Sequence, residues 1–424
     1  MRSRGCSSAS RELSKFANEV YQIRLHYRPE AADLESMLAS VDVERIYQHI
    51  LKTEGEKHPL YSPASMEACA DYILAEFESY GLKTRVHEFK VEGFDYTFRN
   101  IESSTGGDGP ELLVVSHYDT ARHAPGANDN GSAIAVMLEA ARVISLGETS
   151  SAVRFISFNL EELNPLRAQQ TEALALEHGI RDENGRYSSW LTSRRMEFFG
   201  KLQSKFITES KTYAEATAKA IAEMSNGLSS SEREFAKSIQ VLLEGLTMAN
   251  WPGQTSLMGS SAWVRDALRR RQKMRGVLCL ETIGYVSHKK NSQSFPEGLD
   301  PSMFRTYGTE PDLKTGDFLT IVGDHNSAAL AETFCEQCRR DSVQLPYVCL
   351  QEDFTYEQAA YIMHDLLRSD HAPFWRENIP ALLLTDSADF RYPFYHTPAD
   401  TIDKLDFDFL AKICRAVVAT ASCL

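Results

Sequence analysis

Hydrophobic positions follow a helical period early in the chain and a strand-like period after it. Over residues 41–81 the apolar side chains recur at helical spacing, and Gly81 is placed to end the second of two predicted helices. Residues 84–98 instead alternate apolar and polar side chains, and the glycine-rich segment 106–109 predicts a turn after them. The pattern therefore predicts helices, then a strand or hairpin that begins an α/β region.

Four later segments share one design, a short apolar run rich in β-branched residues that ends at a histidine, a carboxylate or a turn residue. They are residues 111–116, 153–160, 276–280 and 381–384. Such runs are typical of buried parallel strands, and the apolar stretch 131–147 predicts a crossover helix. We expect an α/β fold with a mostly parallel central sheet and helices on both faces.

The pattern changes between residues 164 and 255, where long amphipathic helical segments follow one another. Basic and acidic residues are interspersed there, which favours a lid, a cleft wall or a dimer surface over a charged tail. We predict an N-terminal extension (1–40), an α/β domain formed by 41–163 and 256–424, and an inserted helical subdomain (164–255). The insertion also offers a surface for a homo-oligomer.

Composition narrows the class of protein. Of 424 residues, 43% are hydrophobic and 25% charged, and no apolar run approaches the roughly 20 residues of a membrane span, so we expect no membrane partner. The first twenty residues lack the apolar segment of a secretory signal, which favours a cytoplasmic location. A formal net charge of -14 argues against a nucleic-acid partner, although carboxylates around a metal would contribute to it.

The eight cysteines are scattered, unlike a dense disulfide framework, so we expect reduced thiols. Cys335 and Cys338 form a CxxC inside a helical-looking run, without a second CxxC or paired histidines. We interpret this pair as structural.

Side chains of metal-ligand type follow the predicted strands. His117 ends the first apolar run, Glu161 and Glu162 the second and Glu281 the third, while Asp129 lies in a Gly/Asn-rich loop that opens a helix. Ligands of open α/β sheets bind beyond the carboxyl ends of the strands. Zinc takes imidazole nitrogen and carboxylate oxygen, and a hydrolytic site keeps one coordination position open for water.

The positions of these residues predict distinct roles. Two neighbouring metals need a bridging carboxylate, and Asp129 suits the bridge because a tight loop presents both of its oxygens from a fixed backbone. Asp119 is placed to accept the second N–H of His117 and fix its tautomer. Only a turn after the strand lets both Glu161 and Glu162 face one cleft, where one would bind metal and the other act as general base.

Each of these features alone has a plainer explanation. An HxD is commonly incidental, adjacent glutamates are common on solvated helix faces, and Glu281 after a strand suits a buried ion pair. The Gly/Asn-rich loop alone suits a turn and helix cap. All four explanations would have to hold together, in this order and at these strand ends, so we favour a metal site.

The motifs together resemble a zinc aminopeptidase family that includes bacterial leucyl aminopeptidases and is related to glutamate carboxypeptidases and glutaminyl cyclases. The resemblance rests on HYDT (117–120), PGANDNGSA (125–133), FNLEEL (158–163), GSSAWVR (259–265), LETIGY (280–285), SDHAPFW (369–375) and YHTPADTIDKLD (395–406). It covers the chain from about residue 41 to the C-terminus except the insertion, and makes 41–163 and 256–424 a zinc peptidase catalytic domain.

The resemblance implies two Zn²⁺ ions per chain and assigns the site residues. The implied metal ligands are His117 and Glu281 for one zinc, Glu162 and His396 for the other, and Asp129 as the bridge. Glu161 is the implied general base, and Asp119 the residue that orients His117. His396 gains its role only from the motif around it, and Asp370 and His371 either line the substrate cleft or pack beneath it.

The sequence departs from the family pattern at three places. Glu281 stands where many members have aspartate, and its longer side chain still reaches a metal. Ala133 replaces a usual glycine. After Glu162, a leucine, Asn164 and Pro165 lead into the insertion where the family has a short connection, so we expect the insertion to shape substrate access.

The implied reaction is hydrolysis of the peptide bond next to a free N-terminal amine, by a metal-activated water with Glu161 as base. One alternative is a single-zinc enzyme like glutaminyl cyclase, which would use Asp129, Glu162 and His396, although His117 argues for a second metal. A carboxypeptidase-like cleft would need arginines, and Arg122 and Arg391 are the nearest candidates in the sequence. A protein of another class, a catalytically silent scaffold, would bind a partner through the insertion.

Overall fold

The apolar runs form the centre of one nine-stranded sheet, in a computed structural model that describes residues 33–107, 109–147, 152–296, 299–310 and 312–424. The order of the strands is β1-β2-β4-β3-β5-β9-β7-β8-β6. The four predicted strands lie side by side and all run parallel: β4 (Val153–Phe158), β3 (Glu111–His117), β5 (Met274–Glu281) and β9 (Ala381–Thr385). The α/β expectation is confirmed, and the carboxyl ends of these strands meet at one edge.

The outer strands make the sheet mixed, so the expected parallel arrangement holds only for its centre. The remaining strands are β1 (Lys83–Lys90), β2 (Thr97–Ser104), β6 (Arg305–Tyr307), β7 (Leu319–Gly323) and β8 (Tyr347–Gln351). β1 and β2 form the predicted hairpin, which extends to Ser104, and β2 also pairs antiparallel with β4. On the other side β7 runs antiparallel to β9, and β6 antiparallel to β8.

Alternate residues of the central strands enter two different hydrophobic cores, which explains why these strands read as continuous apolar runs. Leu112 and Val114 of β3 face the first core, whereas Leu113 and Val115 face the second. Helices that pack on the first core are α2 (Leu34–Ala39), α3 (Val43–Thr53), α4 (Pro63–Ser79), α5 (Ala133–Ser145), α11 (Ala328–Cys338) and α14 (Phe407–Cys423). Those on the second are α10 (Met258–Arg269), α12 (Tyr356–Ile362) and α13 (Ala372–Arg376).

The N-terminal boundary of this body lies earlier than residue 41. Met37 and Leu38 of α2 are buried in the first core, and residues 1–32 of the predicted extension lie outside the described residues. Cys335 and Cys338 are buried on α11 in the same core. The helices of the described part of the chain include no candidate for a membrane span.

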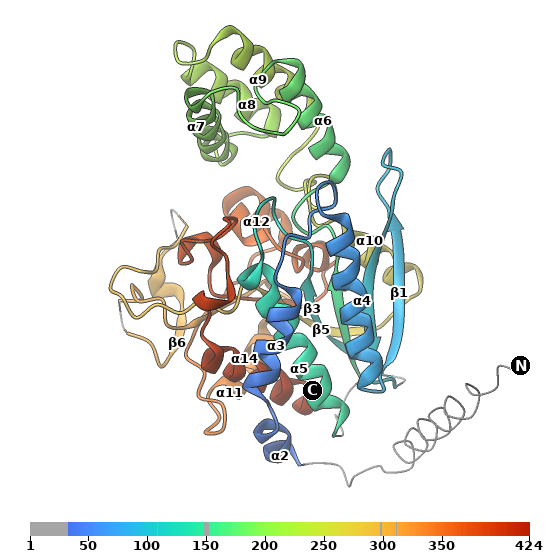
Figure 1. Ribbon diagram of the computed structural model, residues 1–424. Helices are drawn as coiled ribbons and strands as arrows, with labels where there is room; N and C mark the ends of the chain where they lie inside the picture. The colour runs from blue at the N-terminus through green and yellow to red at the C-terminus, as the bar shows by residue number, and fades with distance from the viewer. Residues whose placement is uncertain (1–32, 108, 148–151, 297–298, 311) are drawn as a thin grey trace, which may run out of the picture.

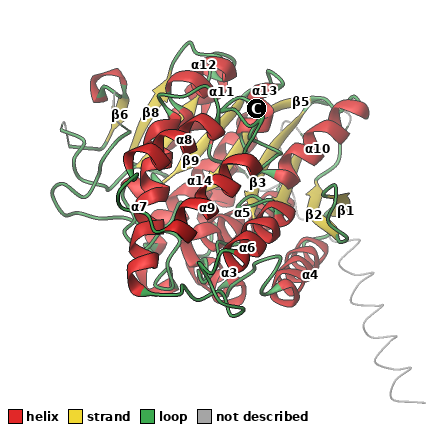
Figure 2. Cartoon of the chain, turned by 90° about the horizontal axis from the view of Figure 1, so that it is seen from above, coloured by secondary structure: helices red, strands yellow, loops and turns green. Residues whose placement is uncertain are grey.

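Four helices between residues 164 and 255 pack around a core of their own. They are α6 (Pro165–Glu177), α7 (Trp190–Ile207), α8 (Tyr213–Glu223) and α9 (Ser230–Leu242), and their shared core includes Met196, Phe199 and Phe235. In Figure 1 they stand above the rest of the molecule. Seen from above in Figure 2, they lie over α5, β3 and α14.

Short irregular elements complete the chain. They are the turn η1 (Ala127–Ser132) and the 3₁₀ turns η2 (Pro301–Met303), η3 (His364–Leu367), η4 (Ala388–Phe390) and η5 (Ile402–Lys404). Within η1, Asp129 and Asn130 leave helical dihedral angles, and the peptide bond between them is cis. η1 connects β3 to α5 at the edge where the carboxyl ends of the parallel strands meet.

Candidate metal centre

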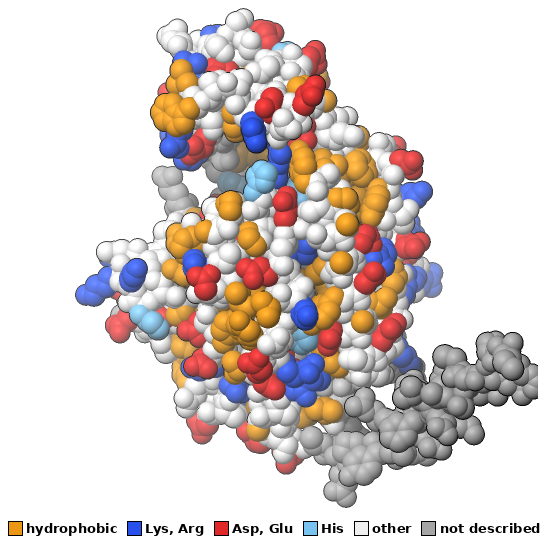
Figure 3. Space-filling view, in the orientation of Figure 1, with side chains coloured by type: hydrophobic (Ala, Val, Ile, Leu, Met, Phe, Trp, Pro, Cys, Tyr) orange, Lys and Arg blue, Asp and Glu red, His pale blue; other side chains and the backbone are white. Residues whose placement is uncertain are grey.

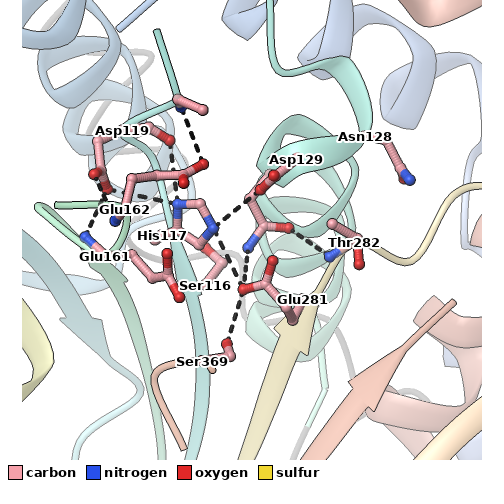
Figure 4. A network of polar contacts seen from close by, with 12 residues as sticks. Ser116, His117, Asp119, Asn128, Asp129, Glu161, Glu162, Glu281, Thr282 and Ser369 are labelled. Atoms are coloured by element: carbon pink, nitrogen blue, oxygen red, sulfur yellow. Dashed lines mark hydrogen bonds and ion pairs between the residues drawn. The ribbon is translucent and has the colours of Figure 1, made fainter. Parts of the chain in front are cut away.

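His117 is the last residue of β3, and its two ring nitrogens point in different directions. Nδ1 lies 3.1 Å from the main-chain carbonyl of Asp119 and 3.5 Å from its carboxylate. Nε2 lies 3.3 Å from a carboxylate oxygen of Asp129 and 3.3 Å from one of Glu281 (Figure 4). A proton on Nδ1, held by the carbonyl, leaves the Nε2 lone pair free to bind a metal.

The carboxylate of Asp119 also holds the turn after β4. It accepts hydrogen bonds from the main-chain N–H groups of Glu161 (3.0 Å) and Glu162 (3.1 Å). Leu160, just before them, has a left-handed φ of 58°, which ends the strand and turns both glutamates toward the cleft. The carboxylate of Asp119 thus fixes the backbone of this turn. The nearer acceptor for Nδ1 of His117 is the main-chain carbonyl of Asp119, not its carboxylate.

Asp129 lies between two groups of ligand atoms. Its Oδ1 is the oxygen nearest His117, and its Oδ2 lies 3.1 Å from Nε2 of His396. The same nitrogen of His396 lies 3.1 Å from Glu162. One group is therefore His117, Asp129 and Glu281, the other is Asp129, Glu162 and His396, and Asp129 contributes one oxygen to each.

The loop that carries Asp129 is held by two further aspartates. Asp400 accepts the main-chain N–H groups of Asn128 (2.8 Å) and Asp129 (3.2 Å), and Asp386 accepts the side-chain amide of Asn128 (2.8 Å). The sequence patterns indicated no role for Asp386 or Asp400. Asp400 lies in the same sequence motif as His396, and this position in the motif was the one sequence feature that could have indicated a role for Asp400. Because the backbone is fixed, the Asp129 carboxylate is presented in one orientation.

The remaining carboxylates are also held in place. Glu162 accepts the main-chain N–H of Ala121 (3.0 Å), and Glu281 accepts the hydroxyl of Ser369 (2.8 Å), a contact that the sequence did not predict. Glu161 is buried, and burial raises its pKa well above the usual range, with Glu281 and Glu162 adding to the effect and His117 opposing it. Glu161 also lies within reach of His117 and Glu162 as a third group of candidate ligands.

Asp370 and His371 are buried beside this cluster. Nε2 of His371 donates to the carbonyl of Leu366 at 2.6 Å, and its ring packs edge-on against Trp375. Burial raises the pKa of Asp370 to about 8, with His117 opposing the shift. His371 therefore packs beneath the cleft. Asp370 instead interacts electrostatically with His117 and Glu161, and its carboxylate raises the pKa of Glu161.

The donor set fits zinc. Nε2 of His117 and Oδ2 of Asp129 are buried and make no well-directed hydrogen bond among the described residues; they only face the oppositely charged groups named above, although buried polar atoms are normally hydrogen-bonded. Four carboxylates face two imidazoles, and close carboxylates of like charge repel one another unless a cation lies between them. Burial alone would lower the pKa of His117, but Glu281 and Glu161 raise it well above its usual value.

Comparisons with known proteins place this arrangement in context. The model of "Peptidase family M28" matches residues 100–303 and 319–421. An uncharacterised Escherichia coli protein, YfbL, is 23% identical over 413 residues, which is 93% of this chain and 92% of YfbL.

Solved structures with a similar fold include an aminopeptidase and a glutaminyl cyclase. The LapA aminopeptidase of Legionella pneumophila has a TM-score of 0.52 at 16% identity, over 94% of this chain and 77% of that one. A Porphyromonas gingivalis glutaminyl cyclase has a TM-score of 0.51 at 14% identity, over 92% of this chain and 99% of that one. At these identities the likeness concerns the fold alone, so the chemistry has to be argued from the site.

Proposed function

This chain belongs to peptidase family M28, and from that membership and its site geometry we propose that it is a two-zinc aminopeptidase that removes the N-terminal residue of peptides. The observation that carries the proposal is the placement of Asp129, whose two oxygens face two different histidines. Asp129, Glu162 and His396 alone would suffice for a single metal. The additional pairing of His117 with Glu281 supports a second metal.

In this proposal Glu161 moves the proton. Zinc ions held by the two groups would polarise the substrate carbonyl and lower the pKa of a water molecule towards about 7. Glu161 accepts the proton of the attacking water and returns it to the leaving amine. Burial raises the pKa of this carboxylate and so makes it a stronger base, which suits a group that must hold the proton between the two steps. Asp119 keeps Glu161 in position through the backbone of the turn.

The carboxypeptidase-like alternative is not favoured by the arginines proposed for it. Arg391 is buried and donates to the side chain of Gln293 (2.6 Å) and the carbonyl of Phe318 (2.7 Å). Arg122 is paired with Glu172 at 3.2 Å. Both guanidinium groups thus already have partners within the protein. A silent scaffold is disfavoured because a buried carboxylate cluster is costly without a cation.

Zinc content and substrate choice test the proposal together. We expect two zinc ions per chain, and hydrolysis of aminoacyl anilides that stops on chelation and returns with added zinc. Peptides blocked at the N-terminus serve as the control and should remain intact, because the free amine is part of the recognised group. Preferential cleavage of blocked peptides would overturn the aminopeptidase assignment, and one zinc with cyclisation of N-terminal glutamine would favour the cyclase-like alternative.

An apolar pocket adjoins the metal centre at Glu281, Ser369 and Tyr395. Its walls include Phe295, Leu299, Phe304, Val322, Leu350 and Leu383. Burying a large apolar side chain gives about 1.5–3 kcal/mol. In the proposed reaction this pocket would receive the side chain of the N-terminal residue.

We therefore expect kcat/KM for leucine and phenylalanine anilides to exceed that for the glycine anilide by at least about 10-fold. Leu299→Trp, which fills part of the pocket, should lower the rate for phenylalanine more than that for glycine. Steady-state kinetics on the three substrates measure both effects. Equal rates for glycine and phenylalanine in the unmodified protein would show that this pocket does not receive the side chain.

A further inference from the structure

The helical insertion begins and ends at the turn that carries the proposed base. Pro165, the first residue of α6, lies three positions after Glu162. At the other end, Leu257 donates its N–H to the carbonyl of Glu161 at 2.9 Å. The two ends are joined to each other, since Asn164 donates its main-chain N–H to Thr255 at 2.6 Å. The insertion is therefore attached directly beside the site.

One wall of the cleft is tied to the insertion through Arg122. The preceding residue, Ala121, donates its N–H to Glu162, so this segment borders the metal centre. The guanidinium of Arg122 lies 3.2 Å from Glu172 on α6 and stacks 3.9 Å above the ring of Tyr61. Tyr61 also donates its hydroxyl to Glu172. A Cβ atom at Gly185 would collide with Arg122, so the insertion approaches closely here.

The opposite wall contacts the insertion through apolar packing. Ile207 and Met248 share a core with Tyr356 of α12 and Leu366 of η3, and the hydroxyl of Tyr356 donates to the carbonyl of residue 249 at 2.8 Å. The chain from η3 runs directly on to Ser369, which binds Glu281. The insertion thus contacts both walls, one next to Glu162 and one next to Glu281.

The surface is hollowed between the insertion and the body, with histidine side chains at the edge of the hollow (Figure 3). Figure 1 shows the helices α6 to α9 above the body, and Figure 2 shows them over β3, the strand that ends at His117. We propose that the insertion is a fixed roof over the metal centre that admits short peptides and excludes long or folded polypeptides. This inference rests on the proposed aminopeptidase function and adds the size of the substrate.

The physical basis is the joining of both walls by one helical subdomain. The insertion has its own hydrophobic core, and it is fastened by charged and aromatic contacts on one side and by apolar packing on the other. On this proposal, a peptide whose N-terminus reaches Glu161 passes its remaining residues under the insertion. Each residue adds about 3.3–3.6 Å of extended chain, and on this proposal the bulk of a folded domain would be excluded by the roof.

Peptides with leucine at the N-terminus and lengths from about 4 to about 30 residues, spanning roughly 14 to 100 Å when extended, test the proposal. We expect kcat/KM to fall by at least about 10-fold between the shortest and the longest, and further when the same N-terminus precedes a folded domain. Replacing residues 166–253 with a flexible linker of about five residues should remove most of this length dependence, since the two ends are already in contact. Zinc content and the rate on the shortest peptide should be retained.

A point substitution keeps the test independent of whether the deletion variant folds. Glu172→Ala breaks the contacts with Tyr61 and Arg122 and should reduce the length dependence several-fold, whereas Glu177→Ala, at an exposed position on the same helix, should not. The roof proposal is wrong if the unmodified protein cleaves peptides of all lengths at equal rates. It is also wrong if the length dependence is unchanged in both the deletion variant and Glu172→Ala.

A measurement without turnover separates the roof from the proposed reaction. In the zinc-loaded Glu161→Gln variant, calorimetric titration should show weaker binding of the longer peptides. If the unmodified protein cleaves none of the peptides but binding still falls with length, the aminopeptidase proposal fails and the roof stands. If peptides of all lengths bind with equal affinity, or if none binds, the roof proposal is wrong.

Discussion

Replacing Glu161 with glutamine is expected to lower kcat by about 10²–10⁴-fold while the zinc content stays at its original value. Glutamine keeps the size of the side chain and leaves intact the main-chain hydrogen bond that Asp119 accepts from residue 161. It removes the carboxylate that takes the proton of the attacking water. The loss should therefore fall mainly on kcat, with KM for an aminoacyl anilide little changed.

A matched control is Glu332→Gln, which makes the same chemical change at an exposed position on α11. Kinetics on the leucine anilide and metal analysis of both variants give the comparison. Full hydrolysis by Glu161→Gln with zinc still bound would mean that another group takes the proton. Loss of zinc in this variant would instead indicate that Glu161 is a ligand, since it lies within reach of His117 and Glu162.

Asp129→Asn is expected to remove both metals at once and to reduce activity by at least about 10³-fold, more than the 10–100-fold typical of residues that only support a ligand. Asp129 is the residue shared by the two groups, with one oxygen directed at His117 and the other at His396. An amide retains one neutral oxygen and presents N–H donors to the other group. Metal analysis and the same anilide assay measure the two effects.

Thermal unfolding provides an independent readout. A ligand at 1,000 times its Kd stabilises the native state by about 4 kcal/mol, so added zinc should raise Tm of the metal-free unmodified protein but not that of Asp129→Asn. Asp353→Asn, at an exposed position, is the control and should respond like the unmodified protein. His396→Ala should lose one zinc and keep the other. Retention of two zincs by Asp129→Asn would exclude it as the bridge.

Local sequence patterns determined the central sheet and the types of residue at its edge. A strand buried on both faces is apolar at most positions, so β3, β4, β5 and β9 were visible as nearly continuous apolar runs. The residue after such a run lies at the carboxyl edge whatever the rest of the chain does, which is why His117, Glu161 and Glu281 were found by position. The turn that lets Glu161 and Glu162 face one cleft followed from the alternation of side chains along a strand.

Tertiary structure decided which distant residues meet at that edge. His396 lies in an irregular segment with a left-handed φ of 55°, where no period marks it, and only the family motif singled it out before the fold placed it beside Asp129. Ser369 and Asp386 gained their roles in the same way, through contacts between segments far apart in the chain. The antiparallel outer strands and the contacts of the insertion with both walls also depend on packing between distant segments. Burial of one face leaves a local hydrophobic period in the sequence. The pairing of distant segments leaves no such period, because that pairing depends on the tertiary packing of the whole chain.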